Sequence, residues 1–155
     1  MIPATADTSF DALVADLTGG GIVTRVLERW SGGRVHAERV ACDVPAPAAT
    51  RALLATGAGD TVGHRRVRLM RGGLLLSEAD NWFLPDRLTS GMWSALETTD
   101  TPFGMVIAPL DPRRETLACE RLAGDPMLLI RALVRGGDGA PLALVEERYR
   151  QAIFG

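Results

Sequence analysis

The sequence predicts an α+β fold in which about three helices pack on an antiparallel sheet of about six strands. Segments with strand patterns follow one another through tight glycine turns, at 72–73 and 136–139, more often than through helices. Helical spacing of apolar residues is confined to 8–17, 22–29, a short piece near 49–54, and 86–96. With 155 residues, 46% of them hydrophobic, the chain is expected to form a single domain, 1–155, with a sizeable core.

The N-terminal third is predicted to be mainly helical. Thr8 or Ser9 can cap a first helix that runs to about Leu17, and the glycines at 19–21 end it. A second helix is expected over 22–29, before the glycines at 32–33. The pattern then predicts a strand over 34–42, closed by prolines at 45 and 47, and a short helix near 49–54.

The remaining chain is predicted to build most of the sheet. Strands over 61–70 and 74–84 form a hairpin, and a helix over 86–96 packs on them, followed by a loop at 98–102. Further strands are expected at 115–122, 127–135 and 142–149, the last two as a second hairpin. No segment approaches the roughly 18 apolar residues of a membrane span.

Charge and composition exclude several classes of function. The 17 basic residues are all arginine, against 19 acidic residues, and the net charge of -2 argues against a nucleic-acid partner. Without lysine, Schiff-base and P-loop chemistry are excluded. Two distant cysteines and two histidines give no zinc-ligand pattern, so we expect no metal. The N-terminus has no basic and apolar leader, which indicates a cytoplasmic chain with free thiols.

Two charged residues occur where a strand pattern places apolar side chains. Arg65 shares a strand face with Val67, and Glu146 shares one with Leu142 and Leu144. Both side chains are therefore predicted to point inward. The functional interpretation is a cavity with the arginine binding a carboxylate and the glutamate handling a proton.

A structural interpretation of the same carboxylate stays open. Glu146 can simply pair with Arg65 or Arg131, or Glu146 and Glu147 can both be solvated edge residues. A charge buried without such a partner would be costly.

Other polar residues of these strands are interpreted as surface. Glu78, Asp80 and Asn81 do not converge, because neighbouring strand residues alternate faces, and exposed strand polarity is expected for them. His64 is likewise expected at the surface.

Several motifs occur in a defined order. They are RRVRL at 65–69, the glycine turn at 72–73, WFLP at 82–85, TPFG at 101–104 and PLALVE at 141–146. Over 21–153 the chain resembles the chorismate lyase family in this order of motifs. That family has a similar R-E-h-x-L strand, in which h is an apolar residue and x any residue, a hairpin ending in proline, and the motifs T-P-L-G and P-L-L-L-T-E. The resemblance to effector-binding domains of GntR-type transcription regulators is weaker. The resemblance to the chorismate lyase family implies a chorismate lyase-like fold.

The resemblance also implies roles for individual residues. The family's carboxylate-binding arginine falls on Arg65, with Arg66 as the alternative if the hairpin is shifted by one residue. Its acidic residue falls on Glu146. The backbone amide of Phe103 would help to hold the ligand carboxylate, and Val23 would cover the ligand.

One position departs from the family. Asn81 stands where chorismate lyases tend to carry a further arginine, so it is a candidate substrate-binding residue that would change recognition of a second carboxylate. The implied reaction eliminates pyruvate from chorismate to leave 4-hydroxybenzoate, without cofactor or metal, in a monomer or homodimer. Two alternatives remain: a non-catalytic module of the same fold that binds a small carboxylate, and an enzyme acting on another aromatic or polyketide-like acid.

Overall fold

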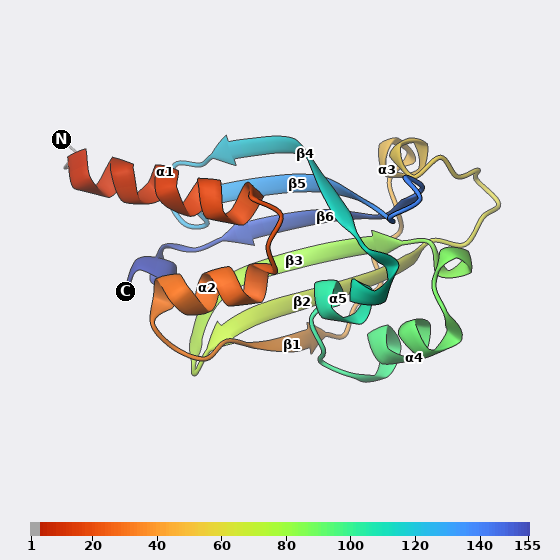
Figure 1. The fold of residues 1–155 in the computed structure, drawn as a ribbon, viewed down its shortest axis with the longest axis horizontal. Helices are drawn as coiled ribbons and strands as arrows, with labels where there is room; N and C mark the ends of the chain where they lie inside the picture. Colours follow the sequence, from red (N-terminus) through yellow and green to blue (C-terminus); the bar gives the residue numbers. More distant parts are fainter. Residues whose placement is uncertain (1–3) are drawn as a thin grey trace.

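The computed structural model describes the backbone of residues 4–155 and the side chains from Thr8 onward. One six-stranded antiparallel sheet, in the order β1-β2-β3-β6-β5-β4, forms its centre (Figure 1). The strands are β1 His36–Val40, β2 Gly63–Arg71, β3 Leu74–Phe83, β4 Arg113–Arg121, β5 Leu128–Arg135 and β6 Pro141–Tyr149. The predicted α+β class with six antiparallel strands is confirmed.

Five α-helices and three 3-10 turns complete the described chain. The helices are α1 Ala4–Thr18, α2 Val23–Ser31, α3 Ala48–Leu53, α4 Ser90–Thr98 and α5 Phe103–Val106. The turns are Pro85–Arg87, Ala108–Leu110 and Gln151–Phe154. None of the helices that the structure describes is both long and apolar enough to cross a membrane.

Two helix predictions need correction. The expected helix over 86–96 is a 3-10 turn followed by α4, because the Thr89 side chain caps α4 by accepting a hydrogen bond from the Met92 amide at 3.1 Å. The first helix begins before Thr8 and Ser9, so neither residue is its cap. The short helix α5 was not predicted, since four residues give too little periodicity.

The hairpin between β2 and β3 sets the register of the functional face. Gly72 has φ 57° at the turn, a conformation that glycine adopts without steric cost. The hairpin places Arg65 opposite Asn81 and Arg66 opposite Asp80. Since neighbouring residues of a strand alternate faces, Arg65 and Asn81 share one face and the other pair shares the opposite face.

Helices α1, α2 and α5 lie over the same face of the sheet (Figure 1). Under α1 and α2, one cluster includes Leu13, Leu27 and Ile130. Under α4 and α5, a second cluster includes Phe103 and Val145. The two clusters leave space where the N-terminal end of α2 faces α5, and the candidate site occupies this space.

The opposite face, which we call the back face, is covered by the connection between β1 and β2. Leu54 packs there against Trp82, Leu133 and Leu144. The backbone of Val44 is held at both ends: its amide donates to His64 Nδ1 at 3.1 Å and its carbonyl accepts from Trp82 Nε1 at 3.0 Å. The central strands are therefore buried on both faces.

Candidate functional site

A cavity of about 140 Å³ lies between the sheet, the start of α2 and the start of α5. Its walls are mainly apolar side chains, with a few polar groups that converge on it. The residues that line it include Ile22, Val23, Thr24, Val67, Leu69, Ala79, Asn81, Pro102, Phe103, Gly104, Ile107, Arg114, Val134, Val145 and Glu147. A concave, mainly apolar space with few polar groups is typical of small-molecule binding sites.

The roof of the cavity contains the first turn of α2. The glycines at 19–21 end α1 and let the chain turn back, with Gly20 at φ 88°. Ile22 is the cap residue and provides no side-chain hydrogen bond to the first turn, which also lacks acidic residues. The amides of Val23 and Thr24 are thus oriented as donors at the positive end of the helix dipole.

The floor of the cavity contains a buried amide. Asn81, from β3, is 3% exposed, and its Oδ1 has no hydrogen-bond partner among the described residues. Its neighbours in the floor include Ala79, Val67 and Val145, which offer only apolar atoms. Leaving a buried polar atom unpaired costs about 1 to 3 kcal/mol, so the position favours a ligand that supplies the missing hydrogen bond.

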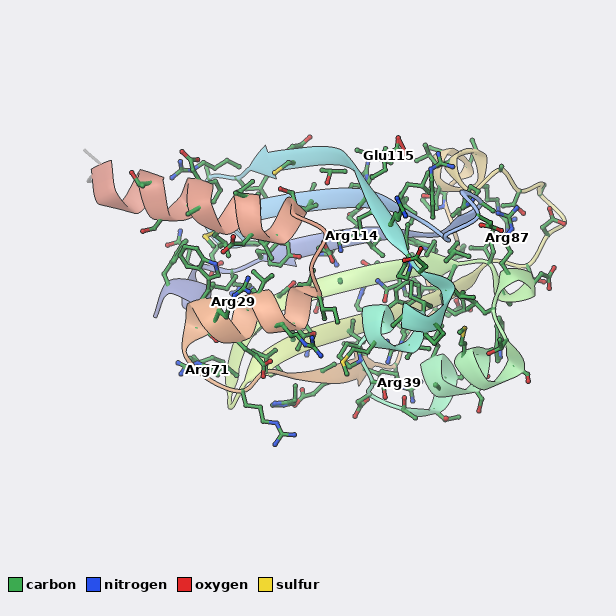
Figure 2. All side chains as sticks on the ribbon, viewed as in Figure 1. Arg29, Arg39, Arg71, Arg87, Arg114 and Glu115 are labelled. Carbon is green, nitrogen blue, oxygen red and sulfur yellow. The ribbon has the colours of Figure 1, made fainter. Side chains whose placement is uncertain are left out.

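An ion pair closes the side of the cavity toward β4. Arg114, labelled in Figure 2, donates from Nη1 and Nη2 to the two carboxylate oxygens of Glu147 at 3.0 and 2.6 Å. Burial alone would lower the pKa of Arg114, but the Glu147 carboxylate raises it above its ordinary value. Burial also raises the pKa of Tyr149, and the neighbouring charge of Glu147 raises it further.

Three of the residues singled out from the sequence meet in this cavity. Val23 covers it, Phe103 lines it at the start of α5, and Asn81 lies in its floor. They come from α2, α5 and β3, and strand pairing and helix packing bring them together.

Arg65 faces the same side of the sheet but lines a neighbouring groove. Its Nη2 donates to the carbonyl oxygens of Thr99 and Thr101 at 3.0 and 2.6 Å, and Arg65 is not among the residues that line the cavity. Arg66, the alternative, points to the back face and binds Asp80 at 2.9 Å. The expectation that an arginine of β2 and the Phe103 amide line one cavity is therefore wrong.

Glu146 also lies away from the cavity. It pairs with Asp80 in the register of β3 and β6, so it is on the back face, where it binds Arg131 at 3.1 Å and Arg148 at 3.3 Å. The prediction that Arg65 and Glu146 share a cavity is wrong, because β6 is apolar on both faces and its pattern does not identify the cavity side. Glu147, considered as a solvated edge residue, is 7% exposed and lines the cavity instead.

The back face carries a charge network that the sequence did not reveal. Asp80 is 3% exposed and accepts hydrogen bonds from Arg66 Nε at 2.9 Å, Arg148 Nη2 at 2.8 Å and His64 Nε2 at 2.7 Å. Burial alone would raise the pKa of Asp80, but these three hydrogen bonds lower it below its ordinary value. Surface positions were expected for Asp80, Asn81 and His64, and all three side chains are buried.

Within the described chain, no group of three or more histidine, cysteine or acidic side chains could hold a metal ion. Cys42 and Cys119 are exposed free thiols.

Comparisons with known proteins locate this arrangement among known folds. No protein-family model matches the sequence. The uncharacterised protein y4mC of Sinorhizobium fredii (strain NBRC 101917 / NGR234) is 37% identical over 124 residues, which cover 74% of this chain and 52% of y4mC. The chain thus spans about half the length of this curated relative.

Several solved structures have a fold similar to that of this chain. The effector domain of PhnF from Mycobacterium smegmatis matches with a TM-score of 0.66 at 15% identity, over 84% of this chain and 89% of that domain. The ligand-binding domain of a GntR-family transcriptional regulator from Bordetella bronchiseptica matches with a TM-score of 0.55 at 16% identity, over 77% and 84%. The chain therefore has the chorismate lyase-like α+β fold of GntR-family effector domains.

Proposed function

We propose that the chain is a non-catalytic module that binds a small organic acid with a single ring in the cavity between α2, α5 and the sheet. The observation that carries the proposal is the buried Asn81 amide, whose Oδ1 has no partner among the described side chains and backbone groups, in the floor of an apolar cavity. The shared fold supports it, since the Bordetella domain is described as ligand-binding.

The size and polarity of the cavity define the ligand class. A volume of about 140 Å³ suits one six-membered ring, because an engineered cavity of about 150 Å³ holds benzene. The ring would contact Val67, Val134 and Val145. A carboxylate would accept hydrogen bonds from the first-turn amides of α2, and a polar substituent would pair with Asn81.

Elimination of pyruvate from chorismate is the competing proposal. It requires a group that takes up a proton or hydrogen-bonds the emerging phenol. Glu146 lies on the back face, and both oxygens of Glu147 are engaged by Arg114. These contacts favour binding over turnover. Incubation with chorismate tests this directly, because catalytic release of pyruvate would overturn the non-catalytic proposal.

Calorimetric titration with 4-hydroxybenzoate, benzoate and related single-ring acids tests binding itself. Ala79→Leu places a larger side chain into the cavity from its floor and is expected to abolish the heat of binding. Ala52→Leu is the matched control, because Ala52 is exposed on α3, far from the cavity lining. Absence of heat and of any thermal shift with every acid, in the folded wild-type chain, would contradict the proposal.

A further inference from the structure

The back face contains a buried histidine close to where the connection between β1 and β2 rejoins the sheet. His64 is the second residue of β2, and its side chain is 1% exposed. It is not among the residues that line the cavity. Because burial keeps water away from both ring nitrogens, their hydrogen-bond partners must be protein groups.

The two hydrogen bonds of His64 define where the proton of its ring lies. The Val44 amide can only donate, so Nδ1, at 3.1 Å from it, accepts and carries no proton. The other nitrogen, Nε2, then carries the proton of the neutral ring and donates to Asp80 Oδ1 at 2.7 Å. The contact with Val44 therefore exists only for the neutral imidazole.

Val44 connects His64 to the segment that covers the back face. Its carbonyl accepts from Trp82 Nε1 at 3.0 Å, so both polar groups of its backbone are bound to the sheet. Its side chain packs against the cluster around Leu54. Residues 41–47 form neither helix nor strand. The segment thus depends on contacts with the sheet, and the hydrogen bond to His64 is one of them.

The charges around His64 do not compensate a second proton on its ring. Asp80 shares its oxygens with Arg66 and Arg148, so two guanidinium groups already offset its negative charge. A further positive charge at 1% exposure would also lack hydration by water. The other ionisable groups on the neighbouring elements are Glu78 and Glu146, which bind Arg148, and Cys42 and Asp43, which line the same groove as His64.

We propose that His64 is a pH-sensitive clasp that holds the 41–47 segment on the back face while its ring is neutral. Uptake of a proton at Nδ1 removes the acceptor of the Val44 amide and sets two N–H groups against each other. The segment then moves away from β2, and water reaches the charged ring. A fall in pH through the ordinary range of histidine, about 6.5, therefore shifts the population toward the released segment. The clasp is on the opposite face from the cavity and needs no ligand.

Amide hydrogen exchange of the ¹⁵N-labelled chain between about pH 7.5 and pH 5.5 tests the clasp. Rates are corrected for the intrinsic pH dependence of exchange and expressed as protection. Protection of the Val44 amide should fall about tenfold or more, because one proton changes the ratio of two states by up to about tenfold per pH unit. Ala132, fully buried in β5, should keep its protection. Equal losses at Val44 and Ala132 would mean unfolding of the whole chain and would contradict a local clasp.

The two histidines of the chain provide a matched pair of variants. His64→Gln keeps an acceptor and a donor but does not titrate, so the Val44 amide should be equally protected at both pH values. His36→Gln removes an exposed imidazole that pairs with Glu38 on β1, and this variant should respond to pH as the wild-type chain does. A response that persists in His64→Gln, or one that disappears in His36→Gln, would overturn the proposal.

The ring nitrogens of His64 give a second measurement, which requires no substitution and replaces the variant if His64→Gln does not fold. Their ¹⁵N signals should show Nδ1 without a proton at neutral pH and with a proton over the pH range in which Val44 loses protection. The indole N–H signal of Trp82, which binds the Val44 carbonyl, should shift over the same range. A protonated Nδ1 at neutral pH, or a Val44 amide that stays protected after Nδ1 is protonated, would contradict the clasp.

Discussion

The two faces of the sheet differ in how the polar residues buried on β2 and β3 are paired. On the back face, Asp80 is almost completely buried and meets three donors, which come from β2 and β6. On the cavity face, Arg65 and Asn81 are buried to the same extent, and each keeps polar atoms without a partner in the described chain. They are direct neighbours across β2 and β3.

This difference separates polar groups that stabilise the fold from groups that can serve a ligand. A fully paired network orders the strands it connects, and removal of one member leaves the others uncompensated. An unpaired polar atom decreases stability until something binds to it, so its removal costs the fold little. Substitutions of paired and of unpaired buried polar groups should therefore have opposite consequences.

The largest effect is expected for Asp80→Asn on the back face. The amide keeps the shape but leaves Arg66 and Arg148 without their shared carboxylate, so the free energy of unfolding should fall by about 4 kcal/mol. Denaturant unfolding measures this change. Asp86→Asn is the control, because Asp86 is exposed in the turn before α4. A loss no larger than that of Asp86→Asn would contradict a stabilising network.

The same carboxylate gives the wild-type chain an acid-sensitive contribution to stability. The pKa of Asp80 is lowered from 3.8 in the folded state, so its contribution is complete above the unfolded value and is lost as the pH falls through the folded value. Stability of the wild-type chain should thus decrease below about pH 4, and Asp80→Asn should show a smaller decrease over that window. If the free energy of unfolding falls equally steeply with pH in the wild-type chain and in Asp80→Asn, the acid sensitivity comes from other groups.

Glu147→Gln should have the next largest effect, although Glu147 lines the cavity. The substitution leaves the largely buried Arg114 uncompensated, and we expect a loss of about 3 kcal/mol, measured by denaturant unfolding. Arg114→Met with Glu147→Leu should recover much of this loss, since a buried ion pair can be replaced by apolar side chains of similar volume. If Glu147→Gln is as stable as the wild-type chain, the pair is not structural.

Asn81→Leu should behave in the opposite way. The side chain has a similar volume and removes the unpaired amide, so stability should stay the same or rise by up to about 1 kcal/mol. Affinity for 4-hydroxybenzoate should fall about tenfold, whereas affinity for benzoate, which has no hydroxyl group, should change little. Thermal unfolding and calorimetry on the same samples check both points. A substantially destabilised Asn81→Leu would place Asn81 among the residues that stabilise the fold.

The smallest effect is expected for Glu146→Gln. Both of its ion pairs involve partly exposed side chains, so the loss should be below about 1 kcal/mol. Ligand binding in the cavity should be unchanged, because Glu146 is on the other face. A loss of ligand affinity in this variant would contradict the separation of the two faces.

The sequence predicted the hairpins and the inward direction of Arg65 because these depend on local signals. The glycine turn at 72–73 and the strict alternation of β2 fix which residues share a face. Alternation fails in β6, where Leu144 and Val145 are both buried, on opposite faces. For that reason the strand pattern predicts the wrong face for Glu146 and leaves a solvated edge position open for Glu147.

The buried partners of the polar residues required the three-dimensional arrangement. Arg114 and Glu147 come from β4 and β6, which are not neighbours in the sheet, and their pairing depends on the placement of β5 between them. The strand pattern predicts an exposed Asp80, because the donors that bury it lie on two other strands. Only the motif order, and not local periodicity, pointed to Val23 and Phe103.

The loop of residues 99–101 links a buried charge to the wall of the cavity. Thr99 and Thr101 hold Arg65 through their carbonyl oxygens, and the next residues, Pro102 and Phe103, line the cavity. A ligand that displaces this loop from the cavity side would therefore also change the hydrogen bonds of Arg65. The guanidinium of Arg65 would then report occupancy of a cavity that Arg65 itself does not line.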